Sequence, residues 1–421
     1  MKYKAEIFDK VQYLYEKTKF NDHQLHCVIR FNGKLNIPVL KKSVMLLLQV
    51  IPILSCVYRH DDGNDYWESV PTPSIDALFH IVYEKDAFEH FTTSKTDAFT
   101  GPQILFCLYR TNEKDALSII MNHMIGDGAG FKQCLYLFSN LYSNLLENSR
   151  YVPNFTISGE RGFQGIIQQI PFKILIKSML FHNKESNQDS SLEFPLSKDM
   201  DIFPFILTRE LDSEKFMQIR TYCKRNQITI NDVFLAAYHR ALLLEIPEAG
   251  NILSLPLMVD MRRYLQDKNF RALTNLSSTS IIHIPIKAEE SFDDTVYTIH
   301  RMVKNRKHDI GVNGFVKLNM GFKFLSNKSS YKLTKKALRN PPICMTNIGI
   351  LDDTKLVFSG TEIEDAFICG SIKYRPHFQI AISSFKDTLT ISSNLYGSRQ
   401  DYETIAHFLF LVEKQLPLSN S

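Results

Sequence analysis

Apolar residues recur along the chain at two spacings, and together these spacings predict an α/β protein. Residues 116–121 form an apolar, β-branched run of strand-like length, which predicts a strand. From Phe131 to Leu145, apolar residues recur at three- and four-residue steps, which predicts an amphipathic helix. Both patterns return in the second half, from a strand-like run at Phe205–Leu211 to a helical pattern over Tyr402–Lys414. The sequence therefore predicts two α/β halves of similar scale.

A polar segment separates the two halves. Residues 183–191 contain no apolar side chain, which predicts a loop or linker. Residues 166–181 before it are mostly apolar and predict a helix, which either packs between the halves or touches lipid or an acyl chain. We therefore expect an N-terminal lobe over residues 1–160, a connecting helix and linker over 161–204, and a C-terminal lobe over 205–421.

Turn and cap residues refine this outline. Turn-forming residues at Asp61–Asn64 and Thr111–Asp115 each separate two strand-like runs, which predicts two β-hairpins. In the second half an apolar helical pattern begins after residue 232, and Asn231 or Asp232 is the expected helix cap. The second hairpin leads directly into the helix after Phe131, so a strand, a tight turn and a helix follow one another there.

Composition narrows the class of protein. The 421 residues, 44% hydrophobic and 22% charged, are enough for a large core and close to globular averages. A net charge of +4 without a dense Lys/Arg run argues against nucleic acid as a partner. Seven dispersed cysteines are typical of a reducing compartment. No run reaches about 18 uncharged apolar residues, so we expect a cytoplasmic protein without a transmembrane segment.

The candidate chemistry lies where the second hairpin ends and the helix begins. His123 follows the strand, and Asp127 and Gly128 come just before the helix. Strand ends beside tight loops are where α/β proteins place chemistry. Imidazole has an ordinary pKa of about 6.5, so it can accept a proton near neutral pH. The neighbouring glycines are expected to let the backbone turn sharply.

Other sites built from a strand, a glycine-rich turn and a helix fit this segment poorly. A dinucleotide fingerprint needs a glycine where Phe131 stands, and Asp127 would point negative charge at the pyrophosphate. No P-loop or Gly-x-Ser-x-Gly segment occurs. His23 and His26 lie three apart on a predicted strand and so face opposite sides, which argues against a metal site. A purely structural role for His123 is the generic alternative.

The arrangement His-x-x-x-Asp-Gly at a strand end resembles the motif of the acyltransferases that share the chloramphenicol acetyltransferase fold. The resemblance covers roughly residues 5–415 and implies two lobes, each a mixed β-sheet covered by helices, arranged as a V with the active site in the tunnel between them. Further segments resemble motifs of this superfamily in the same order: Asn36–Leu54, Thr229–Ala237, Leu257–Leu265, Thr274–Ser278 and Thr346–Gly349.

Departures from the superfamily pattern indicate a branch. Condensation domains usually carry two adjacent histidines, and here the first position is Asn122. The Asp-Phe-Gly-Trp-Gly motif of the plant enzymes is absent, and Trp67 is the only tryptophan. The chain is most similar to stand-alone proteins grouped with condensation domains and alcohol acetyltransferases, which act in secondary metabolism. This similarity favours acylation of an alcohol or amine over peptide-bond formation.

The resemblance also implies roles for individual residues. His123 is the expected general base. Asp127 is expected to pair with Arg262, or alternatively Arg263, and to support the site together with Gly128. Thr346, Asn347 and the backbone N–H groups near Gly128 are candidates for contacts to the oxyanion or the acceptor. Breaking a buried Arg–carboxylate pair from one side costs about 3–5 kcal/mol, so Asp127 is expected to serve geometry as much as chemistry.

The expected co-substrate is acyl-CoA or a phosphopantetheinyl carrier thioester, with a small-molecule alcohol or amine as acceptor. No permanently bound cofactor and no metal is expected. A carrier protein would act in trans, and a free-standing condensation enzyme or a non-catalytic interaction protein of the same fold are the alternatives. An anionic donor would favour a basic segment near one mouth of the tunnel, and the densest one contains Lys328, Lys332, Lys335, Lys336 and Arg339.

Overall fold

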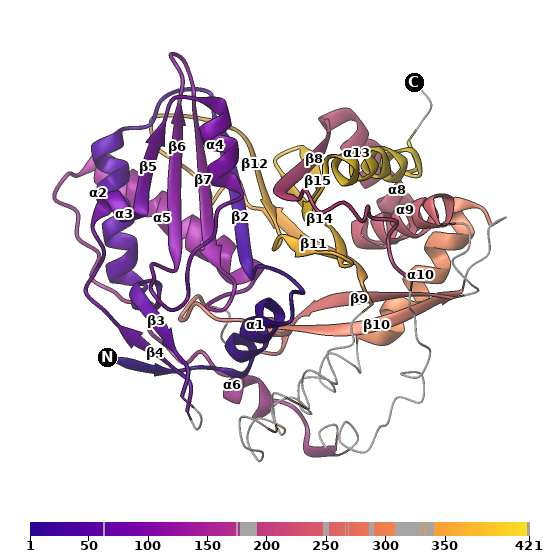
Figure 1. Ribbon diagram of the computed structural model, residues 1–421, viewed down its shortest axis with the longest axis horizontal. Helices are drawn as coiled ribbons and strands as arrows, with labels where there is room; N and C mark the ends of the chain where they lie inside the picture. The colour runs from indigo at the N-terminus through magenta and orange to yellow at the C-terminus, as the bar shows by residue number, and fades with distance from the viewer. Residues whose placement is uncertain are drawn as a thin grey trace.

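The computed structural model contains two lobes that lie side by side, with the N-terminus in one and the C-terminus in the other (Figure 1). A mixed β-sheet with helices packed against it forms the centre of each lobe. The structure describes residues 1–61, 64–173, 176, 192–246, 252–265, 267, 269–285, 290–307, 329, 332 and 341–418.

The central sheet of the first lobe has five strands. Their order is β12 (Ile363–Cys369), β2 (Gln24–Phe31), β7 (Asp115–Asn122), β6 (Ile104–Arg110) and β5 (Phe79–Val82). Its helices are α2 (Ile37–Val50), α4 (Lys85–Thr92) and α5 (Gly128–Glu147). β5 is parallel to β6, and the other neighbours are antiparallel. Alternate strand residues face opposite sides, so Ile29 packs in the core with α2 and α5 while Val28 packs with Phe88 of α4.

The second lobe contains the other five-stranded sheet. Its strands are β11 (Ile343–Leu351), β14 (Phe378–Phe385) and β15 (Thr388–Gly397), with β13 (Lys373–Tyr374) and β8 (Phe203–Leu211) both paired to β15. Its helices are α8 (Ser213–Asn226), α9 (Ile230–Glu245), α10 (Phe292–Lys307) and α13 (Arg399–Lys414). β11 and β14 are parallel, as are β13 and β15, and the remaining pairs are antiparallel. Phe234, Ile380 and Phe408 are fully buried where these helices cover the sheet.

A two-stranded ribbon reaches from the second lobe toward the first (Figure 1). It pairs β9 (Ile252–Asp260) with β10 (Ser277–Pro285), and the short 3-10 helix η3 (Met261–Tyr264) follows β9. The ribbon brings Arg262 and the loop before β10 toward the first lobe. The remaining short elements are β1 (Lys2–Lys4), β3 (Cys56–Arg59) and β4 (Tyr66–Ser69), which form a small sheet, and α1 (Ile7–Lys17), η1 (Pro52–Ser55), α3 (Ile75–Leu78) and α6 (Gln164–Ile167).

Strand β12 belongs to the second half of the sequence but to the sheet of the first lobe. It pairs antiparallel with β2, so that Ile368 lies opposite Cys27. Ile368 packs into the core of the first lobe, and Phe367 packs on the opposite face of the same sheet. The lobes are therefore joined by an exchanged strand as well as by the connecting segment, while the boundaries at residues 160 and 205 stay predictions.

Most predicted elements are present. Both hairpins form, as β3–β4 and β6–β7, and each lobe has the predicted mixed sheet with helices. The cap expected at Asn231 or Asp232 is wrong: Thr229 caps α9, because its Oγ1 accepts from Asp232 N at 3.2 Å while Asp232 bonds back to Thr229 N at 3.0 Å. Of the predicted helix at 166–181, Ile166 packs with Phe163 in a small core, and residues 174, 175 and 177–181 lie outside the described residues.

Candidate active site

His123 lies in the turn between β7 and α5 and faces the second lobe. Its backbone N–H donates to the carbonyl oxygen of His23 at 2.7 Å, which ties the turn to the start of β2. Within the turn, the Asn122 side chain accepts a hydrogen bond from Met124 N at 2.9 Å. The imidazole is thus fixed at a strand end by hydrogen bonds on both sides of the turn.

Asn275, in the loop before β10, sets the tautomer of the His123 ring. Its Nδ2 donates to the backbone oxygens of His123 and Met124, each at 2.9 Å. Because both amide hydrogens are used, Oδ1 is the atom that lies 3.1 Å from His123 Nδ1. An amide oxygen only accepts, so in the neutral ring Nδ1 carries the hydrogen and Nε2 keeps its electron pair. The 2% exposure of Asn275 shows that packing holds this arrangement.

Burial lowers the pKa of His123 below its ordinary value of 6.5, because an imidazolium ion would lose solvation. A backbone hydrogen bond, the Asp127 charge and the bond to Asn275 raise the pKa, whereas the positive charge of Lys373 lowers it, and the net direction is downward. The ring is therefore neutral at neutral pH, which is the state that a general base requires.

Asp127 caps helix α5 and joins the two lobes. Its Oδ1 accepts from Gly130 N at 2.9 Å, and its Oδ2 accepts from Arg262 at 2.8 Å and from Leu276 N at 2.7 Å. Arg262 also donates to the carbonyl oxygen of Thr274 at 2.9 Å. The expected contact between Asp127 and Arg262 is thus present, and both carboxylate oxygens have partners other than the imidazole.

Electrostatics hold Asp127 in the charged state. Burial raises the pKa of Asp127, but the Arg262 charge and the hydrogen bonds from Arg262, Gly130 and Leu276 outweigh burial and leave the pKa below 3.8. The alternative partner, Arg263, lies over the ring of Tyr264 at 5.3 Å. Asp127 is therefore placed as a clamp on loop geometry rather than as a relay partner of His123.

A second clamp, from Arg161, was not foreseen from the sequence. Arg161 donates to both carboxylate oxygens of Asp9 on α1, at 2.9 and 3.0 Å. It also donates to the carbonyl oxygens of Ile125 in the turn and Leu273 in the second half, at 3.2 and 2.8 Å. One buried guanidinium thus connects α1, the His123 turn and the loop that carries Asn275. Arg161 stands in the segment predicted as a linker, where sequence patterns give no sign of burial.

The glycines of the motif serve packing rather than a special backbone conformation. A Cβ on Gly126 would lie 2.8 Å from the side chain of Leu273, and a Cβ on Gly130 would lie 3.2 Å from it. Neither these glycines nor Gly128 has a positive φ, so the turn between β7 and α5 does not depend on the left-handed conformation that glycine allows. Gly128 has room for a Cβ at 3.6 Å from Ile348. The close approach of the Leu273 loop is what requires small residues at 126 and 130.

The turn lies on a cavity of about 240 Å³ between the lobes. The first lobe lines the cavity with α1, the His123 turn and the first residues of α5, and the second lobe lines it with β9, β10, β11 and β14. Cys344 and Thr346 line it as alternate residues of β11, which face the same side of the strand. The first N–H groups of α5 lie at this wall, and a helix N-terminus favours negative charge.

Both predicted oxyanion candidates from β11 line this cavity, but only one has a free polar group. The Asn347 side chain accepts from Gly349 N at 2.8 Å and donates to Asn231 at 3.4 Å. The Thr346 hydroxyl has no hydrogen-bond partner among the described residues, and its side chain is half-buried. Thr346 is therefore the better placed of the two to donate to a bound group.

Solved structures with a similar architecture support the fold that the sequence motifs predicted. The chain matches the epimerization domain of the third module of tyrocidine synthetase B (14% identity, TM-score 0.70, covering 99% of this chain and 97% of that one). It matches the trichothecene 15-O-acetyltransferase TRI3 from Fusarium sporotrichioides (12%, 0.73, 98% and 94%) and the first condensation domain of the CDA synthetase (12%, 0.71, 100% and 98%).

The chain has the chloramphenicol acetyltransferase-like fold. The resemblance predicted from the sequence motifs is confirmed at the level of the fold, over nearly the whole chain. No protein-family model matches the chain, and no curated protein matches it by sequence. The V-shaped arrangement of the lobes stays a prediction.

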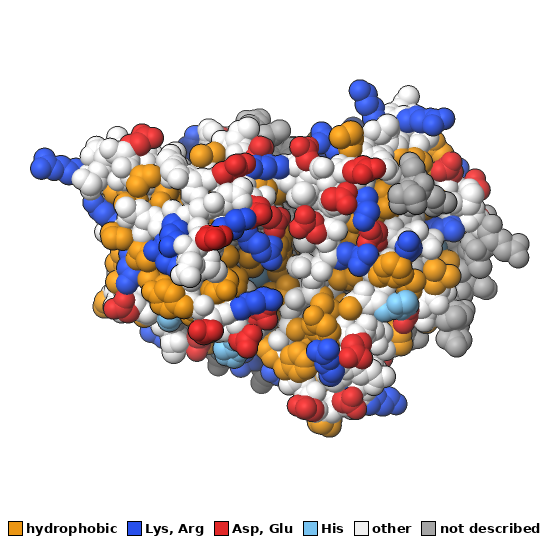
Figure 2. Space-filling model, turned by 90° about the horizontal axis from the view of Figure 1, so that it is seen from above, with side chains coloured by type: hydrophobic (Ala, Val, Ile, Leu, Met, Phe, Trp, Pro, Cys, Tyr) orange, Lys and Arg blue, Asp and Glu red, His pale blue; other side chains and the backbone are white. Residues whose placement is uncertain are grey.

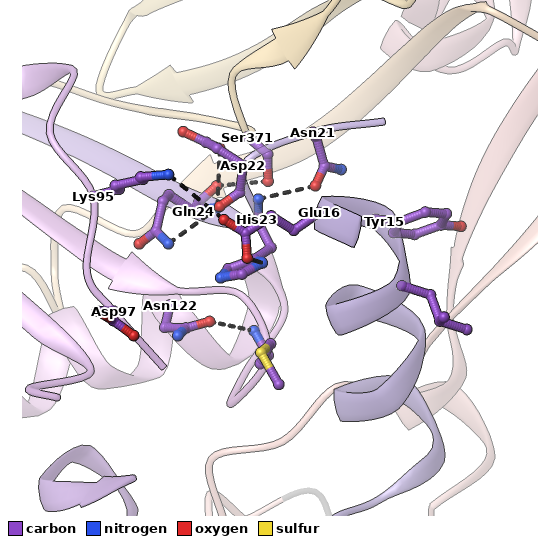
Figure 3. A network of polar contacts seen from close by, with 12 residues as sticks. Tyr15, Glu16, Asn21, Asp22, His23, Gln24, Lys95, Asp97, Asn122 and Ser371 are labelled. Atoms are coloured by element: carbon purple, nitrogen blue, oxygen red, sulfur yellow. Dashed lines mark hydrogen bonds and ion pairs between the residues drawn. The ribbon is translucent and has the colours of Figure 1, made fainter. Parts of the chain in front are cut away.

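Figure 3 shows a polar network at the start of β2, and two of its members, Asn21 and Ser371, line the cavity. Asp22 accepts from Gln24 N at 3.2 Å, Asn21 accepts from His23 N at 2.9 Å, and Ser371 donates to the carbonyl oxygen of Gln24 at 2.7 Å. Burial lowers the pKa of His23 to about 3, so this second histidine stays neutral. His23 supports the turn through its carbonyl oxygen and is not placed as a second base.

Asn122 stands where condensation domains usually carry another histidine, and it is fully buried. Its Nδ2 donates to Gln103 Oε1 at 2.7 Å, and its Oδ1 accepts from Met124 N. Figure 3 shows Asn122 below the His23 network. Both ends of the amide are therefore used to hold the turn, which leaves no group of Asn122 for a substrate.

A second and larger hollow lies on another side of the lobe boundary. It has a volume of about 760 Å³ and lies between α4 and β7 of the first lobe and β8 of the second. Figure 2 shows the surface hollowed between the lobes, with hydrophobic side chains inside and charged ones around the rim. The charged residues on its walls are largely paired, for example Arg30 with Asp365 and Lys114 with Glu364.

Three further expectations concern a metal site, a membrane span and the basic segment. Among the described residues, no group of three or more His, Cys, Asp or Glu side chains is placed to hold a metal ion. No helix within the described ranges is long and apolar enough to cross a membrane. Of the basic segment, Lys328, Lys335, Lys336 and Arg339 lie outside the described residues, so its expected contact with an anionic donor is untested.

Proposed function

We propose that the chain is an acyltransferase that moves an acyl group from a thioester to the hydroxyl or amine of a small molecule, with His123 as general base. The observation that carries the proposal is the Asn275 contact. It leaves Nε2 of a neutral, partly buried imidazole unprotonated beside a cavity. A hydroxyl or amine that attacks a carbonyl carbon must lose a proton, and such a nitrogen is suited to take it.

The reaction proceeds in two proton transfers. The acceptor oxygen or nitrogen forms a bond to the thioester carbonyl carbon as its proton moves to His123 Nε2. The tetrahedral intermediate then collapses, the carbon–sulfur bond breaks, and the thiolate takes the proton from the imidazolium. The developing oxyanion is stabilised by the N-terminus of α5 near Gly128 and by the Thr346 hydroxyl, both on the cavity wall.

We propose acyl-CoA as the donor and a free-standing condensation reaction with a carrier-protein thioester as the alternative. The name of the Fusarium protein describes an O-acetyltransferase, and that of the CDA synthetase fragment describes a condensation domain. In this chain a buried amide, Asn122, stands where condensation domains usually carry a further histidine, so His123 is the base that the turn offers. One base is sufficient for transfer to an alcohol or amine.

The test is a transfer assay with both donor classes. Purified protein is given acetyl-, butyryl- or octanoyl-CoA, or the same acyl groups on a phosphopantetheinylated carrier protein, together with a mixture of alcohols and amines. Free thiol and acylated products are measured by a colorimetric thiol assay and mass spectrometry. His123-dependent products from acyl-CoA support the proposal, and products from carrier thioesters alone support the alternative.

The fold also occurs in a protein named as an epimerization domain. An aminoacyl carrier substrate in deuterated water therefore belongs in the same assay. Deuterium at the Cα position of the recovered amino acid, without acyl transfer from either donor class, would contradict the proposal. A non-catalytic interaction protein would give neither result.

A further inference from the structure

A buried lysine without a partner lines the same cavity as His123. Lys373, on the short strand β13, is 4% exposed. Its Nζ lies 4.4 Å from the centre of the Phe20 ring. Among the described residues, no hydrogen bond or ion pair satisfies the ammonium group. A cation–π contact replaces only part of the hydration that an ammonium loses on burial.

Asp22 does not form an ion pair with Lys373 and acts on its charge only through space. Its Oδ1 accepts from the backbone N–H groups of Ile372 and Gln24, at 2.9 and 3.2 Å, and burial raises the pKa of Asp22 to about 7, which weakens it as a counter-ion. Burial lowers the pKa of Lys373, while Cys344 and Asp22 act in the opposite direction. A buried cation with no counter-ion destabilises the folded protein, and such costs are commonly found at functional sites.

Two carboxamides on the cavity wall accompany the lysine. Asn21 is the antiparallel bridge partner of Lys373, and directly opposed residues of such a pair point to the same face of the sheet. Asn21 Oδ1 accepts from His23 N, whereas its Nδ2 has no acceptor among the described residues. Gln379 packs against Gly370, and its amide likewise has no described partner. One ammonium and two amides thus provide unused N–H donors.

Resting on the proposed function, we propose that this end of the cavity binds the carboxylate of the acceptor, which is a small hydroxy acid or amino acid. Lys373 neutralises the carboxylate, and Asn21 and Gln379 donate hydrogen bonds to it. The hydroxyl or amine of the same molecule then lies at His123. Charge-assisted hydrogen bonds of this type are about twice as strong as neutral ones.

The size of the cavity fits this class of acceptor. A volume of about 240 Å³ favours a compact acceptor over a bulky one. A dicarboxylic acyl donor would carry the same anionic group on its acyl chain. The two sources are separated by placing the carboxylate on the acceptor or on the donor in turn.

The experiment measures binding without turnover. Ligand-observed NMR titrations of the full-length protein give dissociation constants for 3-hydroxybutyrate and for its methyl ester, which lacks the charge. We expect wild type to prefer the acid and Lys373→Met to reduce this preference about 10-fold or more. Lys373→Arg keeps part of the preference. Lys85→Met, on a three-quarters exposed lysine of the larger cleft, serves as the matched control and leaves the preference unchanged.

The melting temperature separates a binding role of Lys373 from a structural one, because the two roles predict shifts of opposite sign in Lys373→Met. Because Lys373 has no counter-ion, Lys373→Met is expected to melt about 1–3 °C higher than wild type. A lower melting temperature would mean that Lys373 serves the fold and would overturn the proposal. Equal affinity of wild type for acid and ester, or an unchanged preference in Lys373→Met, would overturn it too.

Failure of the carboxylate site and failure of the proposed function give different results. Loss of acid preference together with His123-dependent transfer to uncharged acceptors overturns the carboxylate site alone. Acid preference that persists in a protein without any transfer overturns the proposed function alone. A Lys373-dependent preference for succinyl-CoA over butyryl-CoA, without one for acid over ester acceptors, would overturn the assignment to the acceptor.

Discussion

The two hollows between the lobes differ in volume and in their polar groups, and the smaller one has the unpaired groups. The larger, of about 760 Å³, has charged residues that are mostly paired, as Arg30 is with Asp365 and Lys114 is with Glu364. The smaller, of about 240 Å³, contains the free Nε2 of His123 and the unpaired ammonium of Lys373. Unused polar groups, and not volume, therefore favour the smaller cavity as the site of the proposed chemistry.

The two hollows also differ in how the lobes meet around them. At the smaller cavity, buried groups from both lobes interlock, since Asp127 bonds Arg262 and Asn275 bonds the His123 turn. At the larger one, the basic member of each pair lies near solvent, since the Arg30 and Lys114 side chains are about half exposed. Groups that must be held at fixed positions are thus found at the smaller cavity.

Replacing His123 has the largest expected effect on turnover. His123→Ala removes the general base, and transfer from acyl-CoA is expected to fall by about 10²–10⁴-fold. The loss is expected in kcat, because the side chain contributes little to binding the donor. Steady-state thiol release measures it, with Lys114→Ala in the larger cleft as control. Equal activity of His123→Ala and Lys114→Ala would contradict the assignment of chemistry to the smaller cavity.

Asp127→Ala and Asp365→Ala compare the ion pairs at the two hollows. It leaves the largely buried Arg262 without a counter-ion, so the free energy of unfolding is expected to fall by about 3–5 kcal/mol. Asp365→Ala in the larger cleft is expected to cost about 0–1 kcal/mol, because Arg30 remains half exposed to water. Urea denaturation followed by circular dichroism gives both values. Similar losses for the two variants would remove the distinction between a clamp and a pair whose arginine stays half exposed to water.

Asn275 tests whether the His123 ring must be held in one tautomer. Asn275→Ala removes the acceptor at Nδ1 and both bonds to the turn, so kcat is expected to fall by up to about 100-fold. Asn275→Asp restores an acceptor with a negative charge, which raises the pKa of His123. Its acidic limb in kcat/KM is therefore expected at higher pH than in wild type. An unmoved limb would show that Asn275 serves only the backbone.

The smallest expected effect concerns the acidic limb of the pH profile of kcat/KM. The folded-state pKa of His123 lies below 6.5, so the base is neutral above this pH and becomes protonated as pH falls through the lowered pKa. A profile of kcat/KM is therefore expected to be flat near neutral pH and to decline only below pH 6.5. In Lys373→Met the limb moves upward, because a nearby positive charge is lost. A limb above pH 6.5 in wild type would contradict a buried, neutral base.

Local patterns were sufficient for the hairpins, the two lobes and the motif. The strand before His123, the helix after Gly128 and the partner Arg262 were all predictable because they depend on short-range periodicity or on a recognisable motif. The exchanged strand β12 was not, since nothing in its own sequence specifies β2 of the other lobe as its neighbour.

The site residues that the sequence did not predict also depend on tertiary packing. Asn275 lies in a segment that resembles a superfamily motif, so a signal existed, but its bond to Nδ1 depends on how the lobes meet. Lys373 and Arg161 are single basic residues among many in the sequence. Only tertiary packing distinguishes Lys373, which is buried without a partner among the described residues, from Arg161, whose side chain is buried with four hydrogen bonds.

The most direct test of the central claim is a crystal structure with a thioether analogue of acyl-CoA, in which a methylene blocks transfer. The analogue is predicted to place its carbonyl group in the smaller cavity. The carbonyl carbon, which corresponds to the carbon that reacts, would lie close enough for an acceptor atom to bridge it to His123 Nε2. Acceptor and carbon would then be about 3–3.5 Å apart. An analogue whose acyl group lies in the larger cleft, away from His123, would contradict the account.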